Sequence, residues 1–131
     1  MIGEEATKGL DFGALRLAIE ARDPDALTGF YAEDAHLRIV HAALLDGPAF
    51  ELRGRAQIER YLRAICDQQM TCSVEDGAVV GQDGTIEFRE LCSYPNGTPI
   101  SVKTTLEVEG GLITRQTDLV ERADRDEGSE R

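Results

Sequence analysis

Residues 85–121 constrain the fold of this chain more than any other stretch, because they contain three strand-like segments joined by two tight turns. The turns are the Pro-Asn-Gly sequence at 95–97 and the Glu-Gly-Gly sequence at 109–111. Asn and Gly accept the positive φ angles that tight hairpins require. Between the turns, apolar and polar side chains alternate from residue 100 to residue 108, which is typical of a strand with one buried face. This stretch therefore predicts an antiparallel meander.

Two acidic residues fall on the faces of this meander that we expect to be buried. Glu90 is in register with the apolar side chains of the first segment, which are Ile86, Phe88, Cys92 and Tyr94. Asp118 shares a face of the last segment with Leu112, Thr114, Gln116 and Val120. Thr104 lies between the two acids on the middle segment. Burial raises the pKa of a carboxyl group, so both are candidates for proton transfer. The structural alternatives are an ion pair of Asp118 with Arg115 or Arg122 and a bulge that turns Glu90 outward.

The length and charge of the chain narrow the possibilities further. We expect a flexible N-terminus at 1–9, a single domain at 10–122 and a disordered charged tail at 123–131. The formal net charge is −11 at pH 7 and no basic stripe is visible, which argues against nucleic acid and anionic membranes as partners. No apolar run approaches the ~18 residues of a membrane-spanning helix, and the N-terminus does not resemble a signal peptide.

The cysteines and histidines predict no metal centre. Cys66, Cys72 and Cys92 are an odd number without metal-ligand spacing, and we interpret them as small buried residues that stay reduced in a cytoplasmic protein. His36 and His41 point to opposite faces of one expected strand, so they cannot converge on an ion. The sequence has no Gly-rich phosphate loop, and we predict no cofactor.

Three helices are expected in the N-terminal half. The first runs from about Phe12 to Arg22, and the Asp-Pro-Asp sequence at 23–25 begins the second with an N-cap and a first-turn proline. The buried side of this second helix consists of Ala26, Leu27, Phe30 and Tyr31. Gly54 leads into the third helix, whose apolar stripe consists of Ile58, Tyr61, Leu62, Ile65 and Cys66 at helical spacing.

The remaining segments set the fold class. Residues 35–41 read as a strand with Leu37, Ile39 and His41 on the inward face, residues 42–53 are expected to be irregular, and residues 71–81 form a strand before the meander. Helices followed by a run of antiparallel strands indicate an α+β fold, with helices on one side of a curved sheet.

Four short motifs occur in a fixed order along these segments. They are Asp-Pro-Asp-Ala-Leu at 23–27, Phe-Tyr-Ala-Glu-Asp-Ala at 30–35, Leu-Arg-Gly-Arg-Ala-Gln-Ile at 52–58, and Val-Glu-Gly-Gly-Leu-Ile-Thr-Arg at 108–115 followed by Asp118. Over residues 10–121 the chain resembles the SnoaL-like branch of the nuclear transport factor 2-like superfamily. The resemblance implies a cone-shaped α+β barrel, with a curved and mostly antiparallel sheet wrapped on about three helices. It also implies an apolar pocket at the open end of the cone and, often, a dimer through the outer sheet face.

The superfamily includes polyketide cyclases, ketosteroid isomerases, epoxide hydrolases and non-catalytic members, so the fold alone does not decide the function. The positions of the isomerase tyrosine, aspartate base and aspartic acid correspond to Leu15, Ile39 and Thr104, none of which can do that chemistry. The cyclases rely on an acid–base aspartate near the end of the chain, which corresponds to Asp118.

Epoxide hydrolysis is a poor match. The tyrosine and asparagine that hold water in limonene-epoxide-type hydrolases correspond to Leu37 and Ile39, which cannot position water. Their final aspartate corresponds to Asp118. Their other acid corresponds to Glu90 if one residue is deleted before the first hairpin turn and to Arg89 otherwise, and neither alignment supplies the family's arginine.

Within this framework Asp118 is the principal acid or base, and Glu90 and His41 are its assistants. If both carboxyl groups are inside and adjacent, one should keep its proton, because two like charges at close range cannot both ionise cheaply. His41 is otherwise a polar surface residue. We expect the pocket to be lined by Tyr31, Leu37, Ile39, Tyr61, Phe88, Thr104 and Leu106.

Three functions fit these residues. The first is a cofactor-independent acid–base enzyme, similar to a cyclase, isomerase or hydrolase, acting on a small hydrophobic molecule. The second is a non-catalytic protein that binds a hydrophobic ligand, and the third is a dimerisation module whose cavity is filled by side chains. Apolar residues on the outer face of the last strands, including Ile113 and Leu119, predict a homodimer.

Overall fold

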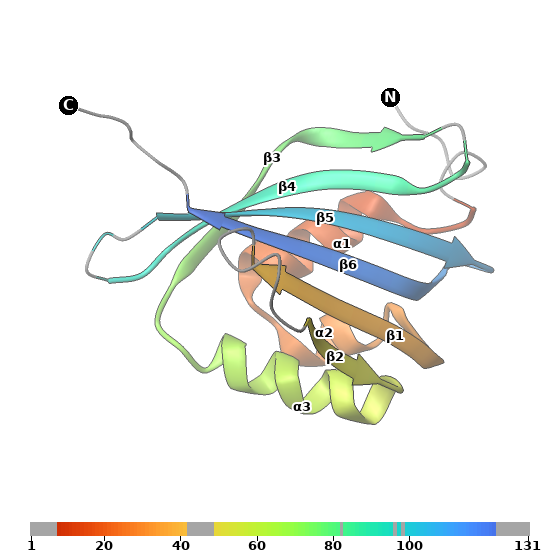
Figure 1. The fold of residues 1–131 in the computed structure, drawn as a ribbon, viewed down its shortest axis with the longest axis horizontal. Coiled ribbons are helices and arrows are strands. Elements are labelled where there is room, and N and C mark those ends of the chain that lie inside the picture. Colours follow the sequence, from red (N-terminus) through yellow and green to blue (C-terminus); the bar gives the residue numbers. More distant parts are fainter. Residues whose placement is uncertain (1–7, 42–48, 82, 96, 98, 123–131) are drawn as a thin grey trace.

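The computed structural model describes residues 8–41, 49–81, 83–95, 97 and 99–122, which form one curved sheet packed against three helices (Figure 1). The helices are α1 (Phe12–Ala21), α2 (Pro24–Thr28) and α3 (Arg55–Cys66). The strands are β1 (Tyr31–His41), β2 (Phe50–Arg53), β3 (Thr71–Val80), β4 (Ile86–Ser93), β5 (Pro99–Glu109) and β6 (Leu112–Arg122). The predicted α+β class and the mostly antiparallel sheet are confirmed.

The six strands lie in the order β2-β1-β6-β5-β4-β3. The last four strands of the chain form the predicted meander, in which each strand is antiparallel to the next. β6 then pairs in parallel with β1, and β1 pairs antiparallel with β2 at the edge. In Figure 1, α1 passes behind β5 and β6 while α3 runs below β2, so the sheet curves around the helices.

Two aspartate caps set the starts of the first two helices. Asp11 accepts a hydrogen bond from the Ala14 N–H at 3.0 Å, and Asp23 accepts one from the Ala26 N–H at 3.2 Å. Each cap satisfies an N–H group that has no partner inside the helix. Between the helices, Arg22 adopts a left-handed conformation with φ 54° and its N–H bonds back to α1. This turn aims the Arg22 side chain away from the α1 axis.

The prediction that Tyr31 belongs to the second helix is wrong. α2 ends at Thr28 and is followed by Gly29, a residue that stabilises helices poorly because of its backbone freedom. Tyr31 instead begins β1, and its side chain is buried. The change of backbone leaves Tyr31 inside the molecule but moves its ring from the helical layer to the sheet.

The expectation of an irregular segment at 42–53 is wrong in its last four residues. Phe50–Arg53 form β2, with Leu52 opposite Leu37 and Phe50 opposite Ile39. Residues 42–48 lie outside the part of the chain that the structure describes. Leu52 is the buried side chain of this short edge strand, so the strand is too brief to show a period of two.

α3 follows the predicted apolar stripe. Ile58 and Leu62 are buried, while Tyr61, Ile65 and Cys66 are half-buried against the core. Gly54 precedes the helix with φ 88°, a conformation that L side chains rarely adopt. The helix packs on β1 and β2 and on α2.

The hairpin turns of the meander adopt the backbone that the sequence predicts. Gly97 has φ 86°, Gly110 has φ 57° and Gly111 has φ 83°. Asn96 lies outside the described residues. The Gly111 N–H also donates to the Lys8 carbonyl at 2.9 Å, which ties the start of the described chain to the last hairpin. The flexible termini predicted at 1–9 and 123–131 otherwise fall on residues that the structure does not describe.

A β-bulge near the start of β6 changes which side chains point inward. Val108 pairs with Ile113, whereas Glu107 pairs with Arg115, so β6 contains one extra residue at this point. Such an insertion shifts the alternation of faces by one residue. Ile113 is therefore buried at 1% exposure while Leu112 is exposed, the reverse of the prediction. Beyond the bulge, the predicted register is correct.

The bulge also corrects the predicted outer face. Ile113 was expected there and belongs instead to the hydrophobic core. Leu119 remains on the outer face and is half-buried, so the homodimer stays a prediction with a smaller apolar basis. Among the helices that the structure describes, none is long and apolar enough to span a bilayer.

Candidate functional site

A cavity of about 270 Å³ opens between the sheet and the three helices. Its lining is mostly apolar, and six residues expected to line it do so, namely Tyr31, Leu37, Ile39, Tyr61, Phe88 and Leu106. Thr104 differs from the expectation, because it is fully buried in the sheet behind the cavity wall. Side chains do not fill this space, so a dimerisation module with a filled core does not fit the structure.

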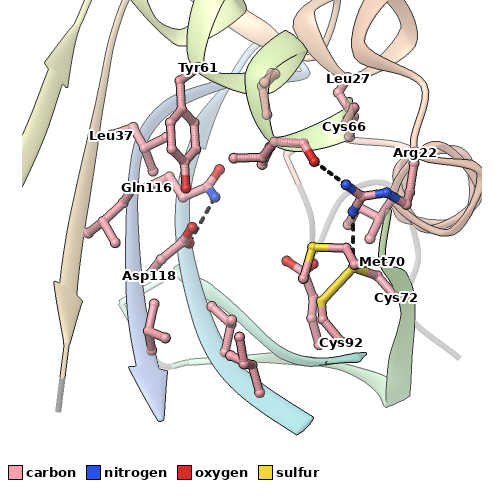
Figure 2. Close-up of a pocket in the computed structure, with 18 of the residues that line it drawn as sticks. Arg22, Leu27, Leu37, Tyr61, Cys66, Met70, Cys72, Cys92, Gln116 and Asp118 are labelled. Carbon is pink, nitrogen blue, oxygen red and sulfur yellow. Dashed lines mark hydrogen bonds between the residues drawn. A yellow bond between two sulfur atoms is a disulfide. The ribbon is translucent and has the colours of Figure 1, made fainter. Parts of the chain in front are cut away.

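Asp118 lies on the cavity side of β6, as predicted. It is opposite Thr104 in the β5–β6 pairing, and its Oδ1 accepts a hydrogen bond from Gln116 Nε2 at 2.9 Å (Figure 2). Burial raises the pKa of this carboxyl group to about 6, although the Gln116 and Thr104 hydrogen bonds favour the ionised form. Of the two arginines considered as its partners, Arg115 pairs with Glu107 instead, and the side chain of Arg122 lies outside what the structure describes.

Glu90 lies on the cavity side of β4, and no bulge turns it outward. Thr104 Oγ1 donates a hydrogen bond to Glu90 Oε2 at 3.4 Å, so Thr104 lies between the two acids, as expected from the meander. Burial, followed by the negative charge of Asp118, raises the Glu90 pKa to about 8. The Thr104 hydrogen bond and the positive charge of Arg22 oppose this rise.

The two carboxyl groups differ in proton affinity, and this difference decides what they can do. At pH 7, a carboxyl group with a pKa of about 6 is roughly nine-tenths ionised, and one with a pKa of about 8 is roughly nine-tenths protonated. Asp118 is thus a base and Glu90 an acid at the same pH. Paired titratable groups with separated pKa values are the arrangement expected for acid–base chemistry.

A hydrogen-bonded chain orients Asp118 from behind. Tyr31 Oη donates to Gln116 Oε1 at 2.6 Å, and the other end of the Gln116 amide holds Asp118. Burial and the charges of Asp118 and Glu90 raise the Tyr31 pKa well above its usual value and the Tyr61 pKa to about 12. Both phenols therefore stay protonated near neutral pH. Figure 2 shows the Tyr61 hydroxyl directed toward Gln116 and Asp118.

Sequence reasoning placed Gln116 on the same face as Asp118 but gave it no role. Its spacing of two residues from Asp118 was the available signal, because side chains at that spacing in a strand are neighbours on one face. The hydrogen bond from Tyr31 to Gln116 was not predicted, because Tyr31 was assigned to a helix. The link between β1 and β6 appears only once the parallel pairing is known.

The two histidines occupy different surroundings. His41 lines the cavity at the end of β1 and its side chain is exposed, so the structure places it at the rim, two residues beyond Ile39, the residue opposite Asp118. His36 points to the other side of β1, as predicted, where its Nε2 lies 2.8 Å from Glu51 Oε1. A catalytic contribution of His41 stays a prediction.

The wall opposite Asp118 contains sulfur and one cation. Figure 2 shows Arg22, Cys66, Met70, Cys72 and Cys92 across the cavity from Asp118. Cys72 and Cys92 are directly opposite each other on β3 and β4 and form a disulfide. The interpretation of all three cysteines as reduced residues is therefore wrong for this pair, and Cys66 is the free thiol. An odd number of cysteines at irregular spacing could not reveal a cross-strand pair.

Glu90 and this cysteine pair also form a possible ligand set for a metal ion. One atom from each of Cys72, Glu90 and Cys92 lies within 4.8 Å of the others, although the sequence spacing suggested no such set. Metals are held by thiolates, whereas these two sulfur atoms are bonded to each other. The residues fit a metal only after reduction of the disulfide, and the prediction of a cofactor-free site stays a prediction.

Comparison with known proteins places this geometry in a family context. Residues 13–116 match the SnoaL-like domain family. A solved structure described as a polyketide cyclase from Xanthomonas campestris pv. campestris is 24% identical, with a TM-score of 0.64 over 88% of this chain and 90% of that one. A structure described as a ketosteroid isomerase from Kribbella flavida is 18% identical, with a TM-score of 0.64 over 95% and 84% of the two chains.

A third similar structure is a nuclear transport factor 2-like protein of unknown function from Mesorhizobium loti. It is 20% identical, with a TM-score of 0.72 over 92% of this chain and 95% of that one. Among curated proteins, no sequence matches significantly. At these identities the structural similarities show the fold, and the chemistry has to be argued from the residues in the cavity.

Proposed function

We propose that this chain, which belongs to the SnoaL-like domain family, is a cofactor-independent acid–base enzyme acting on a small, mostly apolar carbonyl compound. The observation that carries the proposal is the pair of carboxyl groups that line one apolar cavity, with pKa values of about 6 for Asp118 and about 8 for Glu90. General acid–base catalysis is most efficient when the pKa of the catalytic group is near the working pH. This pair supplies a base and an acid together at neutral pH.

In the proposed step, the Asp118 carboxylate removes a proton from the carbon next to the carbonyl group. The C–H electron pair forms the new C=C bond, and the carbonyl π pair moves to oxygen. Glu90 donates its proton to that oxygen, which gives a neutral enol, a protonated Asp118 and an ionised Glu90. Return of the Asp118 proton to carbon and of the oxygen proton to Glu90 restores both groups. The net result is exchange or migration of hydrogen.

The surroundings of the pair support this assignment. Gln116, held by Tyr31, fixes the orientation of the Asp118 carboxylate, and fixed groups lose less entropy in the transition state than mobile ones. The Tyr61 hydroxyl, protonated because its pKa is about 12, is a further hydrogen-bond donor at this wall. His41 at the rim would carry protons to and from solvent.

The names of two similar structures, a polyketide cyclase and a ketosteroid isomerase, favour a small-molecule reaction of this kind. The residues expected from the isomerases are replaced here by Leu15, Ile39 and Thr104. The structure leaves both Leu15 and Ile39 as apolar lining of the cavity. The chemistry proposed for this chain therefore depends on its own pair, Asp118 and Glu90.

The test is hydrogen–deuterium exchange at the carbon next to the carbonyl of 2-tetralone, a neutral bicyclic ketone, followed by proton NMR in D2O. We expect the protein to accelerate exchange and Asp118→Asn to lower the rate by about 10²- to 10⁴-fold, the usual contribution of a general base. Glu87→Gln is the matched control, because Glu87 lies on the outer face of β4 and pairs with Lys103. Exchange that Asp118→Asn leaves unchanged would refute the proposal.

A second candidate function is the non-catalytic binding of a hydrophobic ligand. It is favoured by the Tyr31–Gln116–Asp118 chain, because an aspartate that is hydrogen-bonded inside the protein can have a purely structural role. The two functions differ in one result. Binding of 2-tetralone in the cavity without accelerated exchange would select the binding protein over the enzyme.

A further inference from the structure

Arg22 gives the cavity a second polar end. It is the one Arg or Lys among the described residues that line the cavity. Its left-handed backbone at the end of α1 places the side chain beside the C-terminus of α3 and against β3. Figure 2 shows the guanidinium group facing the cavity from the side opposite Asp118. The cavity therefore has Asp118 at one wall and a cation at the other, with Glu90 nearer the cation, beside Cys72 and Cys92.

The hydrogen bonds of Arg22 hold the guanidinium group without neutralising it. Nη2 donates to the carbonyl oxygens of Ile65 and, at 3.3 Å, of Gln68, and Nη1 donates to Cys72 Sγ at 3.3 Å. A guanidinium has five N–H donors, so the Nε–H and one Nη1–H have no partner among the residues described. No carboxylate of the described chain forms a salt bridge with Arg22.

This lack of a carboxylate partner distinguishes Arg22 from most other arginines of the described chain. Arg16, Arg53, Arg63, Arg89 and Arg115 all form salt bridges on the surface. A half-buried charge is costly to leave unpaired. The nearest acidic group to its end of the cavity, Glu90, is mostly protonated at neutral pH and leaves the cation available.

We propose that Arg22 binds an anionic group of the cavity's ligand, so that the substrate class is a small carboxylate with an aromatic or alicyclic body and a carbonyl group at the far end. The carboxylate would receive the two free N–H donors of Arg22. The apolar body would contact Ile19, Leu62 and Phe88, which line the space between the two walls. The reacting carbon would then lie toward Asp118. This inference rests on the cavity being the ligand site, as proposed above.

The test compares two probes with the same bicyclic body, 2-naphthoate and the uncharged 2-naphthamide, by isothermal titration calorimetry at pH 7. We expect wild-type protein to bind 2-naphthoate at least about tenfold more tightly, as a charge-assisted hydrogen bond predicts. Arg22→Gln should remove this preference and leave 2-naphthamide binding within about twofold. Arg22→Lys should keep part of the preference, because it keeps the charge. Arg115→Gln, which removes one positive charge from the outer face, should change neither affinity.

Three outcomes would overturn the inference. One such outcome is equal binding of the two probes by the wild type, and another is equal weakening of both by Arg22→Gln. Either would mean that Arg22 only stabilises the end of α3 and does not bind an anion. If circular dichroism shows that Arg22→Gln does not fold, two other measurements test the inference. They are the ratio of the wild-type affinities for the two probes and the same ratio for Arg22→Lys. Binding of neither probe would overturn both this inference and the proposed ligand site, whereas binding without preference overturns this inference alone.

Discussion

The two faces of the β4–β6 meander contain the same kinds of charged residue in opposite arrangements. On the outer face, Glu121 lies 2.8 Å from Arg89, Glu87 lies 3.6 Å from Lys103, and Glu107 lies 3.8 Å from Arg115. On the inner face, Asp118 and Glu90 share Thr104 and have no salt bridge with any described residue. Adjacent residues of one strand, such as Arg89 and Glu90, thus serve different purposes.

Electrostatic energy is available for chemistry on the inner face of the sheet and not on its outer face. Exposed ion pairs in water contribute about 0–1 kcal/mol each and are screened by salt. A carboxyl group on the cavity side loses solvation without gaining a cation, so its neutral form is favoured. The inner acids therefore titrate near neutral pH because of their surroundings, and the outer pairs keep the sheet surface charged.

The largest effect should appear in the pH dependence of 2-tetralone exchange. The rate should rise as Asp118 ionises near pH 6 and fall as Glu90 loses its proton near pH 8. Outside this window it should drop about tenfold per pH unit. Other charged or titratable groups that line the cavity with the pair include Arg22 after the end of α1, Tyr31 and His41 from β1, and Tyr61 from α3. The raised pKa values of Tyr31 and Tyr61 keep both phenols protonated between pH 6 and 8.

Glu90→Gln sharpens this prediction, because it should lower the rate and abolish the fall near pH 8. Glu87→Gln, on the outer face of the same strand, should leave the whole profile unchanged. A falling limb that persists in Glu90→Gln would mean that another group is the acid.

The next effect concerns stability at high pH. The folded-state pKa of Glu90 is raised from 4.5 to about 8, so its stabilising contribution is complete below about pH 4.5 and is lost as the pH rises to about 8. The free energy of unfolding of Glu90→Gln minus that of wild type should therefore be larger at pH 9 than at pH 4, by an amount on the order of 4 kcal/mol. Urea denaturation at the two pH values measures this. An equal effect at both pH values would show that Glu90 is solvated.

A smaller effect should follow from loss of the disulfide on the inner side. The Cys72–Cys92 bond closes a segment of 20 residues, for which chain entropy predicts about 3 kcal/mol. The paired substitution Cys72→Ser with Cys92→Ser should lower the free energy of unfolding by roughly that amount. Cys66→Ser, which removes the free thiol, is the control and should cost less. Equal losses in the two variants would mean that the disulfide adds no stability.

The sequence predicted much of the fold because its signals are local. Hairpin glycines such as Gly97, the Asp23 cap and the alternation of β5 each act within a few residues, and all are confirmed. The inward position of Asp118 and Glu90 followed from the same alternation. The bulge before Arg115 was missed, because the identity of Thr114 gives no sign that the strand contains an extra residue there.

The rest of the candidate site depends on contacts between distant segments. The Tyr31–Gln116 hydrogen bond joins residues 85 positions apart, and the Arg22–Cys72 contact joins residues 50 positions apart. Such pairs exist only after β1 has paired with β6 and α1 has packed on β3. Side-chain type alone could therefore identify the two acids of the cavity but not its cation and its disulfide.

The smallest effect should come from the outer face, and it tests whether the exposed ion pairs there contribute little to stability. Lys103→Gln removes the partner of Glu87, a pair whose two side chains are each 44% exposed. We expect it to change the free energy of unfolding by less than about 1 kcal/mol in low salt and by less still in 1 M NaCl. The pH–rate profile of 2-tetralone exchange should not move. A loss of several kcal/mol would mean that the outer pairs hold the curved sheet in shape, and the two faces would then differ less than their burial implies.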